Sequence, residues 1–415
     1  MTQPLFANAP SIWPVDAPRA VLIGRVWLPG TGPVLVRVQP DGVYDLSALA
    51  PTCSELLELP DAAQRVRALA VPRLADMATV LAASHPDHAN DHALRLLAPL
   101  DLQAIKAAGV TFVASMLERV IEERARGDAA QAEVARQAVV AVMGDDLSQV
   151  RPGSAQAAHL KSVLLAQGMW SPYLEVGIGP DAEIFTKAPC LSAVGWGSEV
   201  GIHPQSEWNN PEPEIVLAVN SRGETVGASL GNDVNLRDFE GRSALLLGKA
   251  KDNNGSCAIG PFIRLFDETY SLDTARAAEL TLTVTGTDGF TLTGRSSMQE
   301  ISRDPADIVK QTIGRHHQYP DGFLLFLGTL FAPTEDRDAP GQGFTHHLGD
   351  HVTIDRDERE SGWRITAIAP RTGVLARREP GGRYGERILA ANVDQVLIVF
   401  AYRKPEPHRR MIDRF

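Results

Sequence analysis

The segment Pro211-Glu-Pro-Glu-Ile-Val-Leu-Ala-Val219 joins two acidic residues to an apolar run, which predicts a β-strand. Side chains two positions apart point to one face of a strand, so Glu212 and Glu214 are expected side by side. Two neighbouring carboxylates repel each other, and they therefore share a proton or bind a cation. The alternative is a strand whose solvent-exposed face carries two acids.

Residues downstream extend this acidic pair. A third acid, Asp233, lies in the polar segment Gly231-Asn-Asp-Val-Asn235, although an ordinary turn aspartate is the alternative. Carboxylate oxygens of this kind suit Mg²⁺, Mn²⁺ or Ca²⁺. Lys249 and Lys251 alternate in Gly248-Lys-Ala-Lys251, so only one of them is expected to point toward the acids.

The remaining sequence predicts an α+β protein of three parts. A helical stretch is expected at about 53–83, and helices at about 113–125 and 128–142 precede short β runs bounded by turn residues. These runs predict a β-rich, largely antiparallel body. The expected parts are an N-terminal domain at 1–95, a catalytic domain at 96–350 and an appended fragment at 351–415.

Composition narrows the class of protein. The chain has 415 residues, and its 40 Lys and Arg against 51 Asp and Glu give a net charge of −11. This acidic balance argues against nucleic-acid binding over the whole surface. No segment approaches the ~18 apolar residues that cross a bilayer. Three scattered cysteines without a CxxC spacing form neither a disulfide framework nor a zinc site, so a cytoplasmic protein without membrane contact is expected.

In combination, the motifs resemble the fumarylacetoacetate hydrolase superfamily. The matching motifs are Glu212-Pro-Glu214, Asn232-Asp233 with Arg237-Asp238, Ala250-Lys251 with Gly260-Pro261, and Gly328-Thr329. Upstream, Leu97-Ala-Pro-Leu-Asp101 and Ala108-Gly-Val-Thr-Phe112 are similar to the branch that dehydrates 2-keto-3-deoxy-pentonates such as xylonate and arabinonate. The resemblance implies a β-rich roll around a divalent cation, a smaller N-terminal domain of mixed α/β structure, and a homodimer or homotetramer.

The resemblance also implies a role for each matching residue. The implied metal ligands are Glu212, Glu214 and Asp233, the implied catalytic residues are Glu118, Lys251 and Ser115, and the implied substrate contacts are Thr329, Lys187 and Arg237. The implied cation is Mg²⁺, with Mn²⁺ or Ca²⁺ as alternatives. Glu240 stands where many family members have Gln, which leaves its role open.

One departure from the family pattern favours a particular reaction. Hydrolase members carry a His–Glu pair on a lid, whereas this chain has Ser115 at the His position and Glu118 at the Glu position. A serine is no general base near neutral pH, so dehydration is favoured over C–C hydrolysis. The structural alternative is that Ser115-x-x-Glu118 is a capping box that opens a helix.

The expected reaction is β-elimination from a 2-keto-3-deoxy sugar acid to 2,5-dioxopentanoate or a similar product. The cation would polarise the ketone and stabilise the enolate. Lys251 or Glu118 would take the C3 proton, and Glu118 would assist the leaving C4 hydroxyl. The alternatives on this scaffold are an acylpyruvate- or fumarylacetoacetate-type hydrolase and a 2-oxo acid decarboxylase.

The last 65 residues resemble a different family. The segments Trp363-Arg-Ile-Thr-Ala-Ile368 and Ala390-Ala-Asn-Val-Asp-Gln-Val-Leu-Ile-Val-Phe-Ala401 are similar to the OB-fold end and first GTPase-domain strand of the circularly permuted GTPase that matures the small ribosomal subunit. The join near 348–352 is interpreted as a fusion or a misjoined gene. No GxxxxGK[ST] motif occurs, so no GTPase activity is expected.

The charge of this fragment leaves one further alternative. Residues 351–415 hold 13 Lys and Arg against 9 Asp and Glu. An inactive chimera whose basic tail contacts rRNA is therefore a third interpretation, less favoured than an enzyme.

Overall fold

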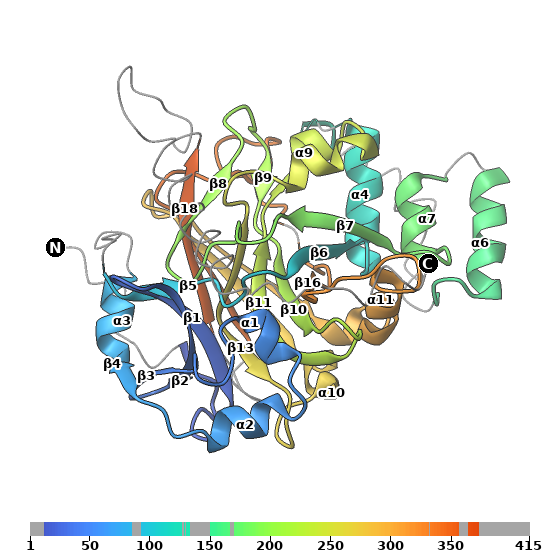
Figure 1. Cartoon of the computed structure of the whole chain (residues 1–415). Helices are drawn as coiled ribbons and strands as arrows, with labels where there is room; N and C mark the ends of the chain where they lie inside the picture. Colours follow the sequence, from blue (N-terminus) through green and yellow to red (C-terminus); the bar gives the residue numbers. More distant parts are fainter. Residues whose placement is uncertain are drawn as a thin grey trace.

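The computed structural model describes residues 12–84, 93–126, 128, 130–132, 150–166, 170–331 and 333–356, and the backbone of 364–372 (Figure 1). These residues form helices and three β-sheets, which confirms the predicted strand-rich α+β class. Most of the helix expected at 128–142 and the apolar segment at 396–401 lie outside the described residues. No described helix combines the length and the apolar character needed to span a membrane.

The largest sheet of the described residues has eleven strands. They are β1 (Leu22–Leu28), β2 (Gly32–Gln39), β3 (Gly42–Asp45), β4 (Arg73–Ala75), β5 (Arg95–Leu97), β6 (Ala104–Gly109), β7 (Glu183–Ala188), β10 (Pro213–Val219), β11 (Thr225–Asp233), β13 (Cys257–Leu265) and β16 (Phe323–Phe326). Their order is β4-β3-β2-β1-β13-β11-β10-β16-β6-β7, and β5 pairs with β1. Neighbours are antiparallel except for β16 and β6, which are parallel. The N-terminal strands thus continue the sheet of the central region, and the division into three domains stays a prediction.

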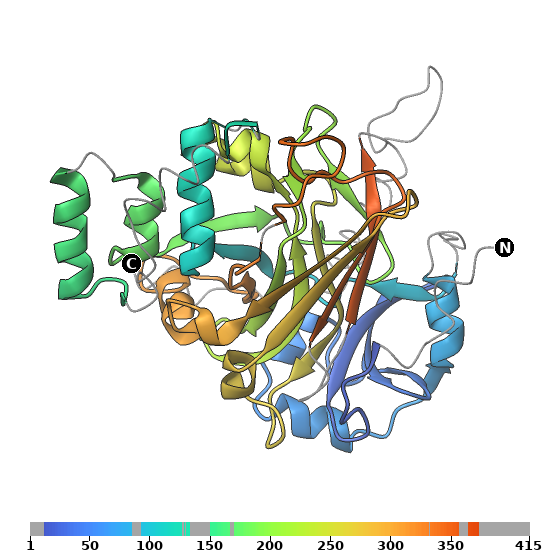
Figure 2. The same cartoon turned by 180° about the vertical axis from the view of Figure 1, so that it is seen from behind.

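A second sheet packs across the first and includes two strands from the C-terminal fragment, β17 and β18. Its order is β15 (Thr291–Ser297), β14 (Glu279–Thr285), β17 (His351–Arg356), β18 (Arg364–Thr372) and β8 (Glu199–Ile202). Seen from behind, its gold to red strands cross the face of the molecule (Figure 2). β18 pairs antiparallel with β17 and parallel with β8, so it links two parts of this sheet. A two-stranded ladder joins β9 (Asn209–Asn210) to β12 (Asn235–Leu236).

Alternation along β10 explains why both faces of the large sheet are covered. Ile215 and Leu217 belong to the hydrophobic core shared with the second sheet. Val216 and Ala218 point the other way, into the core formed with α1 and α2. Every residue of β10 is therefore buried, as an apolar run of this length favours.

The helices lie around the sheets, with α6 and α7 projecting to one side (Figure 1). They are α1 (Cys53–Leu57), α2 (Ala62–Ala68), α3 (Met77–Ala83), α4 (Val113–Ala125), α6 (Ala155–Ala166), α7 (Pro172–Ile178), α8 (Arg237–Glu240), α9 (Leu247–Lys251), α10 (Leu272–Arg276) and α11 (Pro305–Thr312). The continuous helical stretch expected at 53–83 is wrong. It is divided after α1, where Pro60 precedes Asp61 in the left-handed conformation (φ 56°), and again by β4.

Candidate active site

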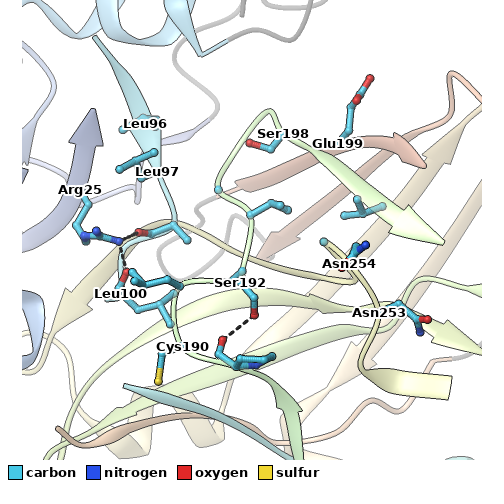
Figure 3. Close-up of a pocket in the computed structure, with 18 of the residues that line it drawn as sticks. Arg25, Leu96, Leu97, Leu100, Cys190, Ser192, Ser198, Glu199, Asn253 and Asn254 are labelled. Atoms are coloured by element: carbon cyan, nitrogen blue, oxygen red, sulfur yellow. Dashed lines mark hydrogen bonds between the residues drawn. The ribbon is translucent and has the colours of Figure 1, made fainter. Parts of the chain in front are cut away.

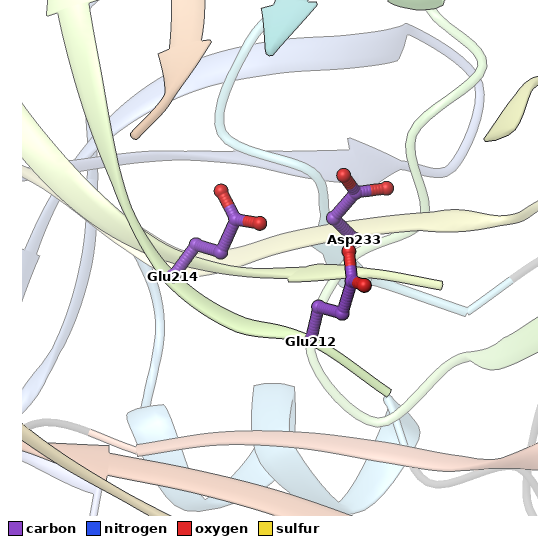
Figure 4. Close-up of side chains that lie close together, drawn as sticks. All are labelled: Glu212, Glu214 and Asp233. Atoms are coloured by element: carbon purple, nitrogen blue, oxygen red, sulfur yellow. The ribbon is translucent and has the colours of Figure 1, made fainter. Parts of the chain in front are cut away.

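Three carboxylates converge where β10 begins and β11 ends. Pro213 of β10 pairs with Asn232 of β11, and this register places Asp233 beside Glu212. One oxygen from each of Glu212, Glu214 and Asp233 lies within 4.8 Å of the others, and the carboxyl groups face a common space (Figure 4). All three residues are 2% exposed. The alternative of a solvent-exposed strand face is therefore wrong, and the expected juxtaposition is confirmed.

Three cations hold two of these carboxylates. Lys251, the last residue of α9, contacts the Glu212 carboxylate and lies 3.0 Å from Asp233 Oδ2. Lys187 Nζ lies 2.8 Å from Asp233 Oδ1, and Arg119 Nη2 lies 2.6 Å from Glu212 Oε1. Lys249 is exposed, as the alternation of the two lysines predicts. The carboxylates thus lie in a buried network of ion pairs.

The acids differ in their electrostatic surroundings. Burial raises the pKa of Glu212, but the ion pairs with Lys251 and Arg119 outweigh it and lower this pKa to about 2. Glu214 accepts a hydrogen bond from the Gly328 amide at 2.7 Å. Burial, and then repulsion by the other two acids, raises the pKa of Glu214 well above its ordinary value. A cation among these groups would offset that repulsion.

Backbone conformation brings the Gly328 amide to Glu214. Gly328 follows β16 with φ +89°, a conformation that favours glycine. A Cβ atom at this position would lie 2.1 Å from the Thr111 hydroxyl oxygen, which donates to the Leu327 carbonyl at 2.6 Å. The Gly328-Thr329 motif therefore serves the acid cluster through its backbone.

The carboxylates line a small cavity of about 20 Å³. Its lining residues are Ala108, Gly109, Val110, Ser115, Arg119, Glu183, Phe185, Glu212, Glu214, Asp233, Glu240, Lys251, Gly328 and Thr329. Five acids here face two cations, and Lys187 behind Asp233 adds a third. If all five acids are ionised, two negative charges are uncompensated. Because buried charge requires a partner, this hard oxygen donor set fits one divalent cation.

Two further predicted residues, Ser115 and Thr329, also lie in this cavity. The Ser115 hydroxyl accepts from the Phe112 amide at 3.3 Å and donates to the Phe112 carbonyl at 2.9 Å. α4 begins at Val113, so Ser115 is its third residue. The capping-box alternative requires Ser115 to be the residue that precedes the helix. This placement is wrong, because Phe112 precedes α4 and Ser115 is its third residue.

Three predicted residues lie elsewhere. Glu118 and Arg237 line a neighbouring cavity of about 250 Å³, where Arg237 Nη2 lies 3.4 Å from Glu118 Oε2. Arg237 also donates to Glu122 at 2.6 Å, and its guanidinium lies 4.8 Å from the centre of the Trp208 ring. Lys187 is completely buried behind Asp233 and is not among the residues that line the small cavity. The structure therefore separates these three side chains from the small cavity.

The cavity also holds acids and a cation that were not predicted as site residues. Glu183 lies against Gly109, where a Cβ atom would come within 2.0 Å of its Oε2. Burial, and then repulsion by Glu240, raises the pKa of Glu183 to about 7. Sequence periodicity could have indicated two of these residues, Glu183 and Arg119. Glu183 is two and four positions before Phe185 and Lys187 on one strand, and Arg119 is one helical turn after Ser115.

A much larger cavity lies elsewhere among the described residues. It measures about 760 Å³ and lies between β5 and the loops around Ser192 and Asn254 (Figure 3). Arg25 at its wall donates to the carbonyls of Ala98 and Leu100. None of the predicted site residues lines it, so chemistry rather than size assigns the candidate site to the small cavity.

The fold is that of solved 2-keto-3-deoxyarabinonate dehydratases. A hexagonal crystal form of such a dehydratase superposes with a TM-score of 0.57 at 20% identity, covering 84% of this chain and 98% of that one. A 2-keto-3-deoxy-D-arabinonate dehydratase complexed with magnesium and 2,5-dioxopentanoate gives a TM-score of 0.57 at 18% identity, with the same coverage. At these identities the similarity shows the fold alone.

Sequence comparison finds relatives for both parts of the chain, although no family model matches it. The 2-dehydro-3-deoxy-D-arabinonate dehydratase of Saccharolobus solfataricus is 33% identical over 158 residues, 37% of this chain and 51% of that protein. The probable 2-keto-3-deoxyxylonate dehydratase of Haloferax volcanii is 30% identical over 182 residues, 44% of this chain and 59% of that protein. The predicted resemblance to such dehydratases is confirmed. The chain matches little more than half the length of either one.

A third relative matches the C-terminal fragment. The small ribosomal subunit biogenesis GTPase RsgA of Gemmatimonas aurantiaca is 64% identical over 69 residues, 16% of this chain and 22% of that protein. The resemblance predicted for the fragment is thereby confirmed.

Proposed function

We propose that this chain is a divalent-metal-dependent dehydratase that converts a 2-keto-3-deoxy sugar acid to 2,5-dioxopentanoate. The observation that carries the proposal is the buried Glu212, Glu214 and Asp233 cluster, which lies in a cavity lined by five acids and two cations. The dehydratase relatives and the shared fold support this substrate class. The replacement of the lid histidine of hydrolases by Ser115 supports dehydration over C–C hydrolysis.

The three clustered carboxylates would hold Mg²⁺, or alternatively Mn²⁺ or Ca²⁺. A bound divalent cation would act as a Lewis acid toward the carboxylate and ketone oxygens of a 2-keto acid. Lys251 contacts two of the three proposed ligands, and Thr329 lines the same cavity. We place Lys251 and Thr329 beside the substrate, with Thr329 toward its carboxylate.

Proton transfer is proposed for the acids of the cavity. Burial lowers the pKa of Lys251, but the charges of Asp233 and Glu212 outweigh it and raise this pKa, which favours the protonated amine. Glu183, with a pKa of about 7, is better suited as the base. Glu183 would take the C3 proton, the C3–H electron pair would form the C3=C4 bond, and the C4 hydroxyl would leave as water with a proton returned by Glu183. Glu118, the acid predicted from the sequence, is the alternative donor. Loss of a C5 proton and return of a proton to C3 would then move the double bond to C4=C5. The resulting C5 enol would take a proton at C4 and lose its hydroxyl proton, which gives the aldehyde of 2,5-dioxopentanoate.

Product analysis tests the reaction. The chain is incubated with Mg²⁺ and 2-keto-3-deoxypentonate, and separately with an acylpyruvate. Formation of a semialdehyde from the sugar acid supports the proposal, whereas loss of the acylpyruvate chromophore without semialdehyde formation supports the hydrolase and overturns it.

The proposal includes the cellular compartment and the oligomeric state of the enzyme. We propose a cytoplasmic homodimer or homotetramer that binds a small 2-keto acid. The three cysteines, Cys53, Cys190 and Cys257, are all free, which is consistent with a reducing compartment. Light scattering during size-exclusion chromatography measures the mass, and a monomer at micromolar concentration would contradict the proposed assembly.

A further inference from the structure

Lys187 contacts the acid cluster through Asp233. Its side chain is completely buried on β7. Its ammonium lies 2.8 Å from Asp233 Oδ1 and donates to the Val234 carbonyl at 3.0 Å. The same ammonium donates to the Lys251 carbonyl and lies 3.4 Å from the Ser256 hydroxyl oxygen.

These contacts use the full donor capacity of the side chain. An ammonium has three N–H donors, and Lys187 has four oxygen neighbours within 3.5 Å. No donor is left for a substrate oxygen, and Lys187 is not among the residues that line the small cavity. A direct substrate contact, the role implied by family resemblance, does not fit this geometry.

We propose that Lys187 is a positioning residue that orients Asp233 and Lys251 for divalent-cation binding. By holding Asp233 Oδ1, it leaves Oδ2 directed at Lys251 and the other acids. By holding the Lys251 carbonyl, it fixes the C-terminal end of α9, from which the Lys251 side chain extends. One ammonium thus sets the position of a metal ligand and of the lysine beside it. This inference rests on the metal site of the proposed function.

The chain contains a matched control. Lys106 is also a buried lysine, on the neighbouring strand β6, and its ammonium donates to the Thr186 hydroxyl at 3.0 Å. Lys106 pairs in register with Thr186, next to Lys187, and it lines neither cavity beside α4. Lys106→Met therefore makes the same chemical change one strand away from the acid cluster.

The test is calorimetric titration of Mg²⁺ into the full chain without substrate. Removing an outer partner of a metal ligand weakens metal binding by about 10- to 100-fold. This loss is expected for Lys187→Met, which removes the ion pair with Asp233. Lys106→Met should bind Mg²⁺ like the unaltered chain. Lys187→Met with unaltered Mg²⁺ affinity overturns the proposal.

Steady-state kinetics separates positioning from substrate contact. At saturating Mg²⁺, KM for 2-keto-3-deoxypentonate should stay within about threefold in Lys187→Met while kcat falls. A large rise in KM with unaltered Mg²⁺ affinity would identify Lys187 as a substrate contact and overturn the proposal.

A second variant covers the case in which Lys187→Met does not fold. Ser256→Ala keeps the charge of Lys187 but removes a hydroxyl that lies near this ammonium and donates to the Lys251 carbonyl at 2.8 Å. A smaller loss of Mg²⁺ affinity, about threefold or more, is expected, and no loss counts against the proposal.

The variant Glu214→Ala distinguishes a wrong role for Lys187 from a wrong metal site. If Glu214→Ala abolishes Mg²⁺ binding and Lys187→Met leaves it unaltered, only the role of Lys187 is wrong. If Glu214→Ala also binds Mg²⁺ normally, the metal site itself is wrong, and the proposed function fails with it.

Discussion

Arg119 and Glu212 form a buried ion pair between α4 and the start of β10, with Arg119 Nη2 2.6 Å from Glu212 Oε1. The same guanidinium reaches Glu122 and Glu240, each at 2.7 Å. One arginine therefore joins a proposed metal ligand to a helix 93 residues earlier in the chain and to α8. The position of α4 and the geometry of the acid cluster are consequently coupled.

Arg119→Met should destabilise the protein by about 3–5 kcal/mol, because it leaves three buried carboxyl groups without their shared cation. Urea unfolding followed by circular dichroism measures this change. Arg124→Met, an exposed change on the same helix, is the control and should stay within about 0.5 kcal/mol. Equal stabilities of the two variants would contradict the importance of the Arg119 network.

Removal of divalent cations should abolish turnover, and added Mg²⁺ should restore it. Binding to the folded state alone should also raise the unfolding free energy, by about 2.7 kcal/mol at 100 times the dissociation constant. Thermal unfolding with EDTA and with Mg²⁺ measures this effect. Glu214→Ala should lose both the turnover and the stabilisation, and retention of both would count against the acid cluster as the metal site.

The activity should rise with pH through about 7, because Glu183 has a pKa of about 7 and must be ionised to act as a base. Glu183→Gln should lower kcat by about 10²- to 10⁴-fold and remove this limb of the pH profile. Measuring kcat and kcat/KM between pH 5 and 9 for both proteins tests these two effects. An unaltered limb in Glu183→Gln would assign the titration to another group.

Glu183 should also make stability depend on pH. Its pKa is raised by burial and by Glu240, so the folded state holds this proton more tightly than the unfolded state does. The contribution favours folding below the unfolded pKa of about 4.5 and is lost as pH rises to about 7. Urea unfolding of cation-free protein measures it across this range. Glu183→Gln should lose less stability over the same interval, and an identical pH dependence would contradict the assignment.

A chain ended at Arg356 should be less stable than a chain ended at Thr372. The shorter chain lacks β18 and thereby leaves edges of β17 and β8 without their hydrogen-bonding neighbour. Open strand edges also favour association between molecules. Thermal unfolding and light scattering compare the two chains. Equal stability and solubility would show that β18 contributes nothing to this sheet.

Local periodicity was sufficient to predict part of the fold and part of the site. The alternation of Glu212 and Glu214 placed both on one face of a strand, and the apolar run after them predicted that strand correctly. Likewise, the alternation of Lys249 and Lys251 predicted that only one would face the acids. These relations hold within one element, where the backbone repeat alone sets the direction of each side chain.

Only the tertiary structure decided which of these faces meet. Arg119 rather than Glu118 lines the small cavity. Ser115 and Arg119 are four positions apart and share one face of α4, and this face packs toward β10. Glu183 reaches the same cavity from β7, and Lys187 on that strand ends behind Asp233. Local sequence sets the face on which a side chain lies, whereas strand order and helix packing, which depend on contacts far apart in the chain, determine its partners. The carboxylate pair can therefore be predicted from nine consecutive residues, whereas the cations that surround it cannot.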